Sequence, residues 1–173
     1  RQLIERQSGD AAGLAAVWKR VPERYRRETS VAAAAATAFQ AQGLSAEAQA
    51  IIERSLEQEW DGGLVSLYGE CRSTDCLRQI ERAERWLDQH HKDSALLLAL
   101  GCLCAQQQLW GKAQSYFEAS IAVEPTYSAH LELAQLNDRL DRADAARKHY
   151  RASLELAVGQ IRRASGGRRR RLV

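Results

Sequence analysis

The chain has few residues that interrupt helices: its 173 residues include only 2 Pro and 11 Gly. Ala, Leu, Glu, Gln and Arg are abundant, and these residues lose little conformational freedom in a helix. The hydrophobic share of 45% is enough for a core that needs no disulfide framework. The composition therefore predicts an all-α fold.

No apolar run reaches the roughly 18 to 20 residues that cross a bilayer, so nothing in this sequence is expected to span a membrane. The chain also lacks methionine and begins at Arg1. We therefore expect a fragment, and an anchor or signal of the intact protein would lie before it.

The four cysteines do not have the spacing of a common metal or haem motif. Cys71 and Cys76 are separated by four residues, and Cys102 and Cys104 by one, so a helix would point the second pair in divergent directions. No Cys-x-x-Cys-His is present for haem attachment. We expect no metal site, no cofactor and reduced thiols, which favours a reducing compartment.

Positive charge is concentrated at the C-terminal end of a chain with a net charge of +3. Residues 162–173 hold six arginines and no acidic residue, and removing those six charges leaves −3 for residues 1–161. We expect a flexible basic tail over 162–173. It is either a solvated end or a contact to an anionic membrane surface through Arg168, Arg169, Arg170 and Arg171. The acidic body argues against nucleic acid as a partner.

An internal repeat carries the fold prediction. Within residues 94–125 the tetratricopeptide pattern of W-x2-L-G-x2-Y, A-x3-F and P falls on Leu97, Leu100, Gly101, Cys104, Ala113, Phe117 and Pro125. Gly101 and Ala113 are small where we expect two helices to cross, and Pro125 ends the second helix. Only the two aromatic positions of the pattern are substituted.

Other copies occur at the spacing of the repeat. One period later, Ala134, Ala146, Tyr150 and Ser153 take the roles of Gly101, Ala113, Phe117 and Ser120, and nearly two periods earlier Ala48, Ile52 and Ser55 take the last three of these roles. The unit between them lacks the small residues and is interpreted as a degenerate repeat. We predict an α-α superhelix, the right-handed stack of antiparallel helix pairs typical of tetratricopeptide repeats.

The predicted organisation is an incomplete leading repeat over 1–28, four repeats with a final helix over 29–161, and the tail over 162–173. Helices are expected near 11–20, 30–42, 45–58, 62–72, 75–90, 94–107, 110–122, 127–139 and 142–163.

Several segments resemble the C-terminal tetratricopeptide region of the bacterial HemY proteins of protoheme IX biogenesis. The resemblance covers about residues 15 to 158, and its most specific pieces are Trp60-Asp61 with Leu67-Tyr68-Gly69, Ala83-Glu84 with Trp86-Leu87, and Leu100-Gly101 with Trp110-Gly111-Lys112-Ala113. It implies a bacterial inner-membrane protein, anchored by N-terminal helices absent here, whose present domain faces the cytoplasm. No catalytic residues transfer from this family.

A protein-interaction scaffold is the function that these observations favour, because a stack of helix pairs presents a concave surface to partners. No set of nucleophile, base and orienting acid is evident, so no catalysis is expected. A porphyrin- or haem-binding carrier is the alternative, although a lone histidine is more often a surface or capping residue than an axial ligand, and His130 and His149 are expected on different faces.

The inner helices are expected to expose a polar surface of mixed charge. It lacks the Lys/Asn cluster that grips C-terminal carboxylates in some tetratricopeptide domains, so such peptides are not expected to bind. The predicted partner-binding residues are Thr37, Gln40, Arg72, Cys102, Gln106, Gln135, Asp138 and Arg139.

Overall fold

The computed structural model describes residues 11–72 and 75–169, and this part of the chain forms ten α-helices and no strand. The predicted all-α class is confirmed. Most helix ends lie close to the predicted ones, and the short α3 was not expected. The helices are α2 (Ala11–Arg20), α3 (Glu23–Arg26), α4 (Thr29–Ala41), α5 (Ser45–Leu56), α6 (Gly62–Glu70), α7 (Cys76–His90), α8 (Ser94–Gln106), α9 (Trp110–Val123), α10 (Tyr127–Arg139) and α11 (Ala143–Arg169).

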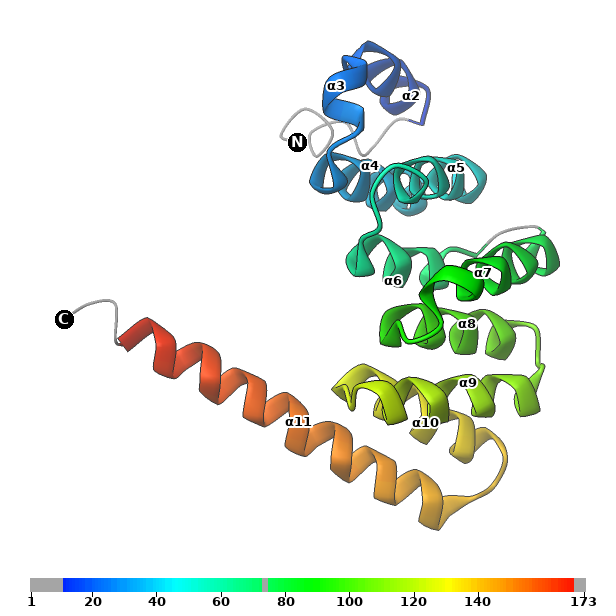
Figure 1. Ribbon diagram of the computed structural model, residues 1–173, viewed down its shortest axis with the longest axis vertical. Helices are drawn as coiled ribbons and strands as arrows, with labels where there is room; N and C mark the ends of the chain where they lie inside the picture. Colours follow the sequence, from blue (N-terminus) through cyan, green and yellow to red (C-terminus); the bar gives the residue numbers. More distant parts are fainter. Residues whose placement is uncertain (1–10, 73–74, 170–173) are drawn as a thin grey trace.

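The helices stack one upon another from α2 at one end to α10 and α11 at the other (Figure 1). Three successive pairs pack closely, α4 with α5, α8 with α9 and α10 with α11. Between the first two, α6 and α7 are joined by a hydrogen bond from Gln79 to Tyr68 O, and α7 packs on α8. Helices α2 and α3 pack on α4. The first helix of each pair contacts the first helix of the next, as α4 does α6, α6 does α8, and α8 does α10. This is the α-α superhelix that the repeat predicted.

Small residues at the repeat positions let paired helices approach closely. Gly101 is buried against Phe117, and a Cβ atom on Gly101 would lie 2.4 Å from the ring. Ala113 is also fully buried at this crossing of α8 and α9. The expectation that residue 101 must be small is confirmed, and the Phe117 ring supplies the reason.

The turns within three of the pairs share one geometry. Gly43, Gln108 and Asp141 have positive φ angles of 72°, 58° and 54°. In each turn the next residue donates its N–H across the helix end, as Leu109 N does to Cys104 O at 2.9 Å. This is the Schellman end of a helix, repeated with the spacing of the sequence repeat.

A serine ties the two helices of a pair together at the far end. Ser120 Oγ donates to Ser94 O and Ser153 Oγ donates to Tyr127 O, each at 2.8 Å. Ser94 and Tyr127 are the first residues of α8 and α10, so one hydrogen bond recurs in two repeats. The matching Ser55 hydroxyl is buried and has no hydrogen-bond partner.

The unit formed by α6 and α7, interpreted from the sequence as a degenerate repeat, has a small residue at its contact with the next pair. Gly69 takes the place of Gly101 one repeat earlier and packs against the backbone of Ala99 in α8. This unit differs from the other repeats in the length of its first helix and of the connection that follows. Helix α6 has 9 residues where α8 has 13, and a longer connection leads to α7.

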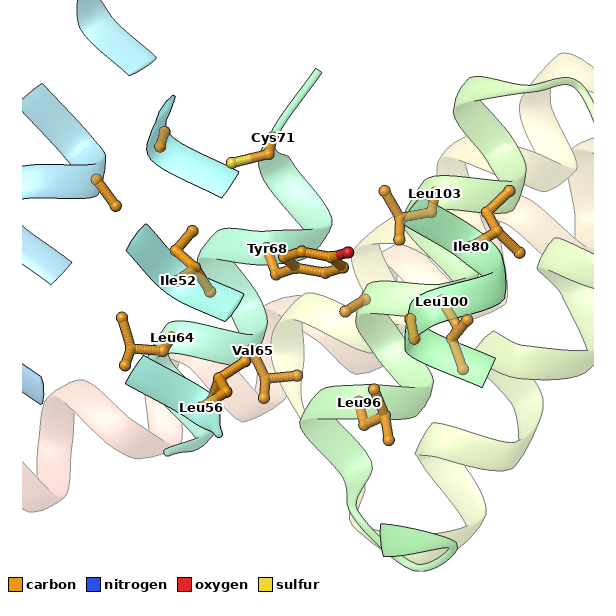
Figure 2. Close-up of a cluster of buried hydrophobic side chains, with 14 of the residues drawn as sticks. Ile52, Leu56, Leu64, Val65, Tyr68, Cys71, Ile80, Leu96, Leu100 and Leu103 are labelled. Carbon is orange, nitrogen blue, oxygen red and sulfur yellow. The ribbon is translucent and has the colours of Figure 1, made fainter. Parts of the chain in front are cut away.

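The largest buried side chain in the middle of the stack is that of Tyr68. Figure 2 shows its ring among buried side chains such as Ile52 of α5, Ile80 of α7 and Leu100 of α8. Its hydroxyl donates to Glu53 Oε1 at 2.8 Å. Burial raises the pKa of Tyr68 far above its ordinary value, and Glu53 raises it further. A single core therefore joins the first three pairs.

The last helix differs from the prediction at its end. Helix α11 runs on to Arg169, so residues 162–169 are helical where a flexible tail was expected to begin. Ala164 and the arginines of this segment favour a helix, whereas Gly166 and Gly167, on which the predicted flexibility was based, do not. The far part of α11 projects away from the stack (Figure 1). Arg170 and Arg171 lie outside the described residues, as do the side chains of Arg168 and Arg169.

Among the described helices, none is long and apolar enough to cross a membrane.

Candidate functional site: a groove along the first helices

A groove of about 600 Å³ runs along the first helices of three pairs. It extends from the end of α6, across the last turn of α8, to α10. The lining residues are Gly69, Glu70, Arg72, Cys76, Cys102, Ala105, Gln106, Gln107, Gln108, Trp110, Glu132 and Arg139.

A smaller hollow of about 180 Å³ lies between α5 and the α2–α3 end, lined by Trp18, Arg26, Ile51 and others. Two of its three arginines are already engaged: Arg26 donates to Val21 O and Lys19 O, and Arg54 pairs with Glu23. The groove is therefore the better candidate for a binding site.

Glutamine side chains from three helices close the C-terminal end of α6. Gln40 of α4 donates to Leu67 O at 3.3 Å, Gln79 of α7 to Tyr68 O at 2.7 Å, and Gln106 of α8 to Gly69 O at 2.9 Å. Leu67 O and Tyr68 O also accept from Cys71 N, whereas Gln106 is the donor to Gly69 O, a carbonyl that the helix end leaves open. The short α6 is thereby fixed beside the groove.

Four of the predicted partner-binding residues line the groove, namely Arg72, Cys102, Gln106 and Arg139. The other four do not. Thr37 donates back to Ala33 O in its own helix, and Gln40 is half-buried and bonded to α6. Asp138 accepts from Tyr150 of α11 at 2.7 Å, and Gln135 is half-buried outside the lining.

Two acidic groove residues, Glu70 and Glu132, were not among the predicted ones. Glu70 takes the place of Cys102 one repeat earlier, so extending the repeat register to α6 would have identified it. Glu132 takes the place of Ala99 one repeat later. A long side chain in the position of an alanine reaches the groove, which the helical period alone does not indicate.

The charged side chains of the groove shift one another's pKa but form no ion pairs with one another. Burial raises the pKa of Glu132 above its ordinary value; Arg139 opposes this shift, and Glu70 adds to it. Burial raises the pKa of the Cys102 thiol to about 12, helped by the charges of Glu132 and Glu70. In the described part of the chain, neither glutamate has a hydrogen bond or an ion pair. The groove thus holds carboxylates without a bound counter-charge.

Cysteine chemistry is suppressed by burial at three of the four positions. Burial raises the pKa of Cys71 and of Cys104 to about 11 each, as it does that of Cys102 to about 12. These residues remain thiols near neutral pH, and a thiol is a poor nucleophile and a poor metal ligand. Within residues 11–72 and 75–169, no group of three or more His, Cys, Asp or Glu could hold a metal ion.

Three histidines make close contacts with other rings. His130 of α10 and His149 of α11 face each other with their Nδ1 atoms 3.0 Å apart. His90 stacks on the indole of Trp60 at a centroid distance of 3.6 Å, and Trp60 Nε1 donates to Asp93. None of the three lines the groove.

Comparison with known proteins identifies the fold. No family model matches the chain, and no curated protein does. Among solved structures, a crystal structure of MamA superposes with a TM-score of 0.58 and 16% identity, covering 91% of this chain and 95% of that one. MamA from Desulfovibrio magneticus RS-1 gives a TM-score of 0.55 and 15% identity, covering 92% and 96%.

At these identities the likeness concerns the fold alone. It supports the tetratricopeptide-like superhelix expected from the repeat and from the HemY resemblance. Membership of the HemY family itself stays a proposal.

Proposed function

We propose that this chain is a non-catalytic interaction scaffold whose groove binds a segment of a partner protein. The observation that carries the proposal is the groove itself, about 600 Å³ of open space lined by side chains from α6, α8 and α10. The helices that form it are held together by a buried core and by the glutamine bonds at the end of α6. A preformed surface loses little conformational entropy when it binds.

The finer part of the proposal rests on the HemY resemblance. The resemblance implies that this chain is one domain of a bacterial inner-membrane protein. N-terminal helices outside this sequence would anchor that protein, and this domain would face the cytoplasm. Its partners are then enzymes of late haem biosynthesis, and the arginines at 168–171 can contact the anionic membrane surface. Peptides that rely on a carboxylate clamp are not expected to bind.

The alternative, a haem or porphyrin carrier, has less support. His130 and His149 point their Nδ1 atoms at each other, and His90 is stacked on Trp60. The groove has a lining of charged and amide side chains, whereas small-molecule pockets are mostly apolar.

A photo-cross-linking experiment in cells tests the proposal. A photoreactive amino acid replaces Gln107, which is exposed on the groove, in the intact membrane protein. The matched control carries it at Glu81, which is exposed on α7 outside the groove. We expect adducts with haem-biosynthesis enzymes from position 107 alone, identified by mass spectrometry.

Other results separate the two parts of the proposal. Adducts from position 107 alone that contain only unrelated proteins would remove the link to haem synthesis and keep the scaffold. The same adducts from both positions, or none from position 107, would overturn the assignment of the groove.

A further inference from the structure

The chemistry of the groove indicates what kind of segment it binds. Glu70 stands at the last residue of α6 and Glu132 in the middle of α10, and both line the same hollow. Their charges raise the pKa of the Cys102 thiol of α8, and the charge of Glu70 raises the pKa of Glu132. Two carboxylates that share a space repel each other, so a cation placed between them is stabilised.

Helix ends add to the negative potential. The last residue of α6 (Glu70), the last of α8 (Gln106) and the last of α10 (Arg139) all line the groove. The C-terminal end of a helix carries a partial negative charge of about half an electron, which favours a cation nearby. Three such ends line this hollow, against two N-terminal ends of opposite sign, those of α7 at Cys76 and α9 at Trp110.

The two arginines of the groove do not neutralise these groups. Arg72 and Arg139 are both exposed, and neither forms an ion pair within the described residues. Arg139 lowers the pKa of Glu132 by more than Glu70 raises it, and burial keeps that pKa raised. Neither glutamate forms an ion pair with the described residues, so a further cation still has carboxylates to bind.

We propose that the groove binds an extended partner segment through a lysine or arginine whose charged group lies between Glu70 and Glu132. Ala105 and the half-buried Trp110 line the same hollow and offer apolar surface to the aliphatic stem of that residue. Arg72 and Arg139 at the exposed edge repel a second basic residue and attract an acidic one. This inference rests on the proposed function, because it assigns a partner class to the same groove.

The test selects peptides from a phage-displayed library of random dodecapeptides on the wild-type chain. The test variant is Glu70→Gln/Glu132→Gln, which keeps shape and removes both charges. The control is Glu59→Gln/Glu81→Gln, which removes the same charge from exposed positions outside the groove. Melting temperatures of all three proteins confirm that they are folded.

We expect the selected peptides to share a lysine or arginine at one position. Their dissociation constants should rise at least tenfold in the test variant and stay unchanged in the control. Binding should also weaken as the pH falls, because protonated Glu132 no longer attracts the cation.

Three results would overturn the inference, each in a distinct way. Peptides that cross-link to position 107 without a shared basic residue would leave the groove as a binding site with another specificity. A failure to select any peptide would remove the groove function as well. Competition by a peptide of residues 162–173, together with self-association of the chain, would assign the groove to a second copy.

Discussion

Gly69 of α6 packs so closely on α8 that a Cβ atom at this position would lie 2.7 Å from Ala99 Cα and 2.8 Å from its Cβ. Real Cβ atoms essentially never approach other atoms closer than 3.0 Å, and the obstacle here includes backbone that cannot rotate away. This contact sets the distance between two walls of the groove. It thus connects a single residue of the repeat to the proposed binding surface.

Gly69→Ala should lower the free energy of unfolding by about 1–3 kcal/mol, the usual cost of overpacking a core. Gly111→Ala is the matched control, since a Cβ atom there has nothing within 4 Å. That control should gain about 0.5–1 kcal/mol, because alanine favours a helix over glycine. Equilibrium denaturation in urea measures both. A Gly69→Ala protein as stable as the control would contradict the close contact.

The contact between Gly101 and Phe117 predicts coupling between two substitutions. Gly101→Ala places a methyl group against the ring, and Phe117→Leu removes ring atoms from the core. Each should destabilise the protein by itself. Together they should cost less than the sum, by about 0.5–3 kcal/mol, because the smaller leucine leaves room for the methyl group. A double-mutant cycle in urea measures this coupling, and strict additivity would argue against the contact.

The repeat could be predicted from the sequence because its signals are local and periodic. Gly101, Ala113 and Phe117 recur with fixed spacing, and a helix pair needs small residues where its backbones approach. The turns obey the same spacing, since Gly43, Gln108 and Asp141 occupy equivalent positions. Helix positions and the stacking order followed from these patterns.

The groove was only partly predictable, because it depends on where α6 ends. A helical period places Gln40 and Gln106 on the inner surface, yet both donate to carbonyls at the early end of α6. The period also does not say how far a side chain reaches, as Glu132 illustrates. The end of α6 and the reach of Glu132 both depend on contacts between helices. The spacing of residues along one helix does not encode such contacts.

Gln79→Glu should destabilise the fold strongly at neutral pH. Gln79 is fully buried and its Nε2 donates to Tyr68 O and Cys71 O, so a carboxylate there would face two acceptors. The loss should be about 1–3 kcal/mol or more, since the group is charged. Gln106→Glu is the control, because Gln106 also donates to α6 but is exposed to water.

The pH dependence of this variant has a definite sign. Burial raises the pKa of a carboxyl in the folded state, so its protonated form can donate to Tyr68 O and restore the bond. Relative to wild type, Gln79→Glu should gain stability as the pH falls from 8 to 5. Thermal unfolding at both values checks this, and a loss that does not change with pH would speak against the buried donor.

The histidine pair predicts the opposite dependence for the wild-type chain. Burial lowers the pKa of both His130 and His149 below their ordinary value of 6.5, and for His149 the charges of His130 and Lys148 on α11 lower it further, against Glu118 on α9. A histidine with a lowered pKa binds fewer protons when folded than when unfolded. Its contribution to stability is therefore present above pH 6.5 and is lost as the pH falls below it.

The preceding repeat shows which residues can replace the two histidines in a test of this pH dependence. Leu97 and Tyr116 occupy the positions of His130 and His149 in the preceding repeat. The variant His130→Leu/His149→Tyr should lose less stability than wild type between pH 8 and pH 5, measured by urea denaturation at each pH. The comparison cancels groups common to both proteins, such as Glu132, whose raised pKa acts in the opposite direction. Equal losses in the two proteins would show that the contact between the two Nδ1 atoms, 3.0 Å apart, does not make stability depend on pH.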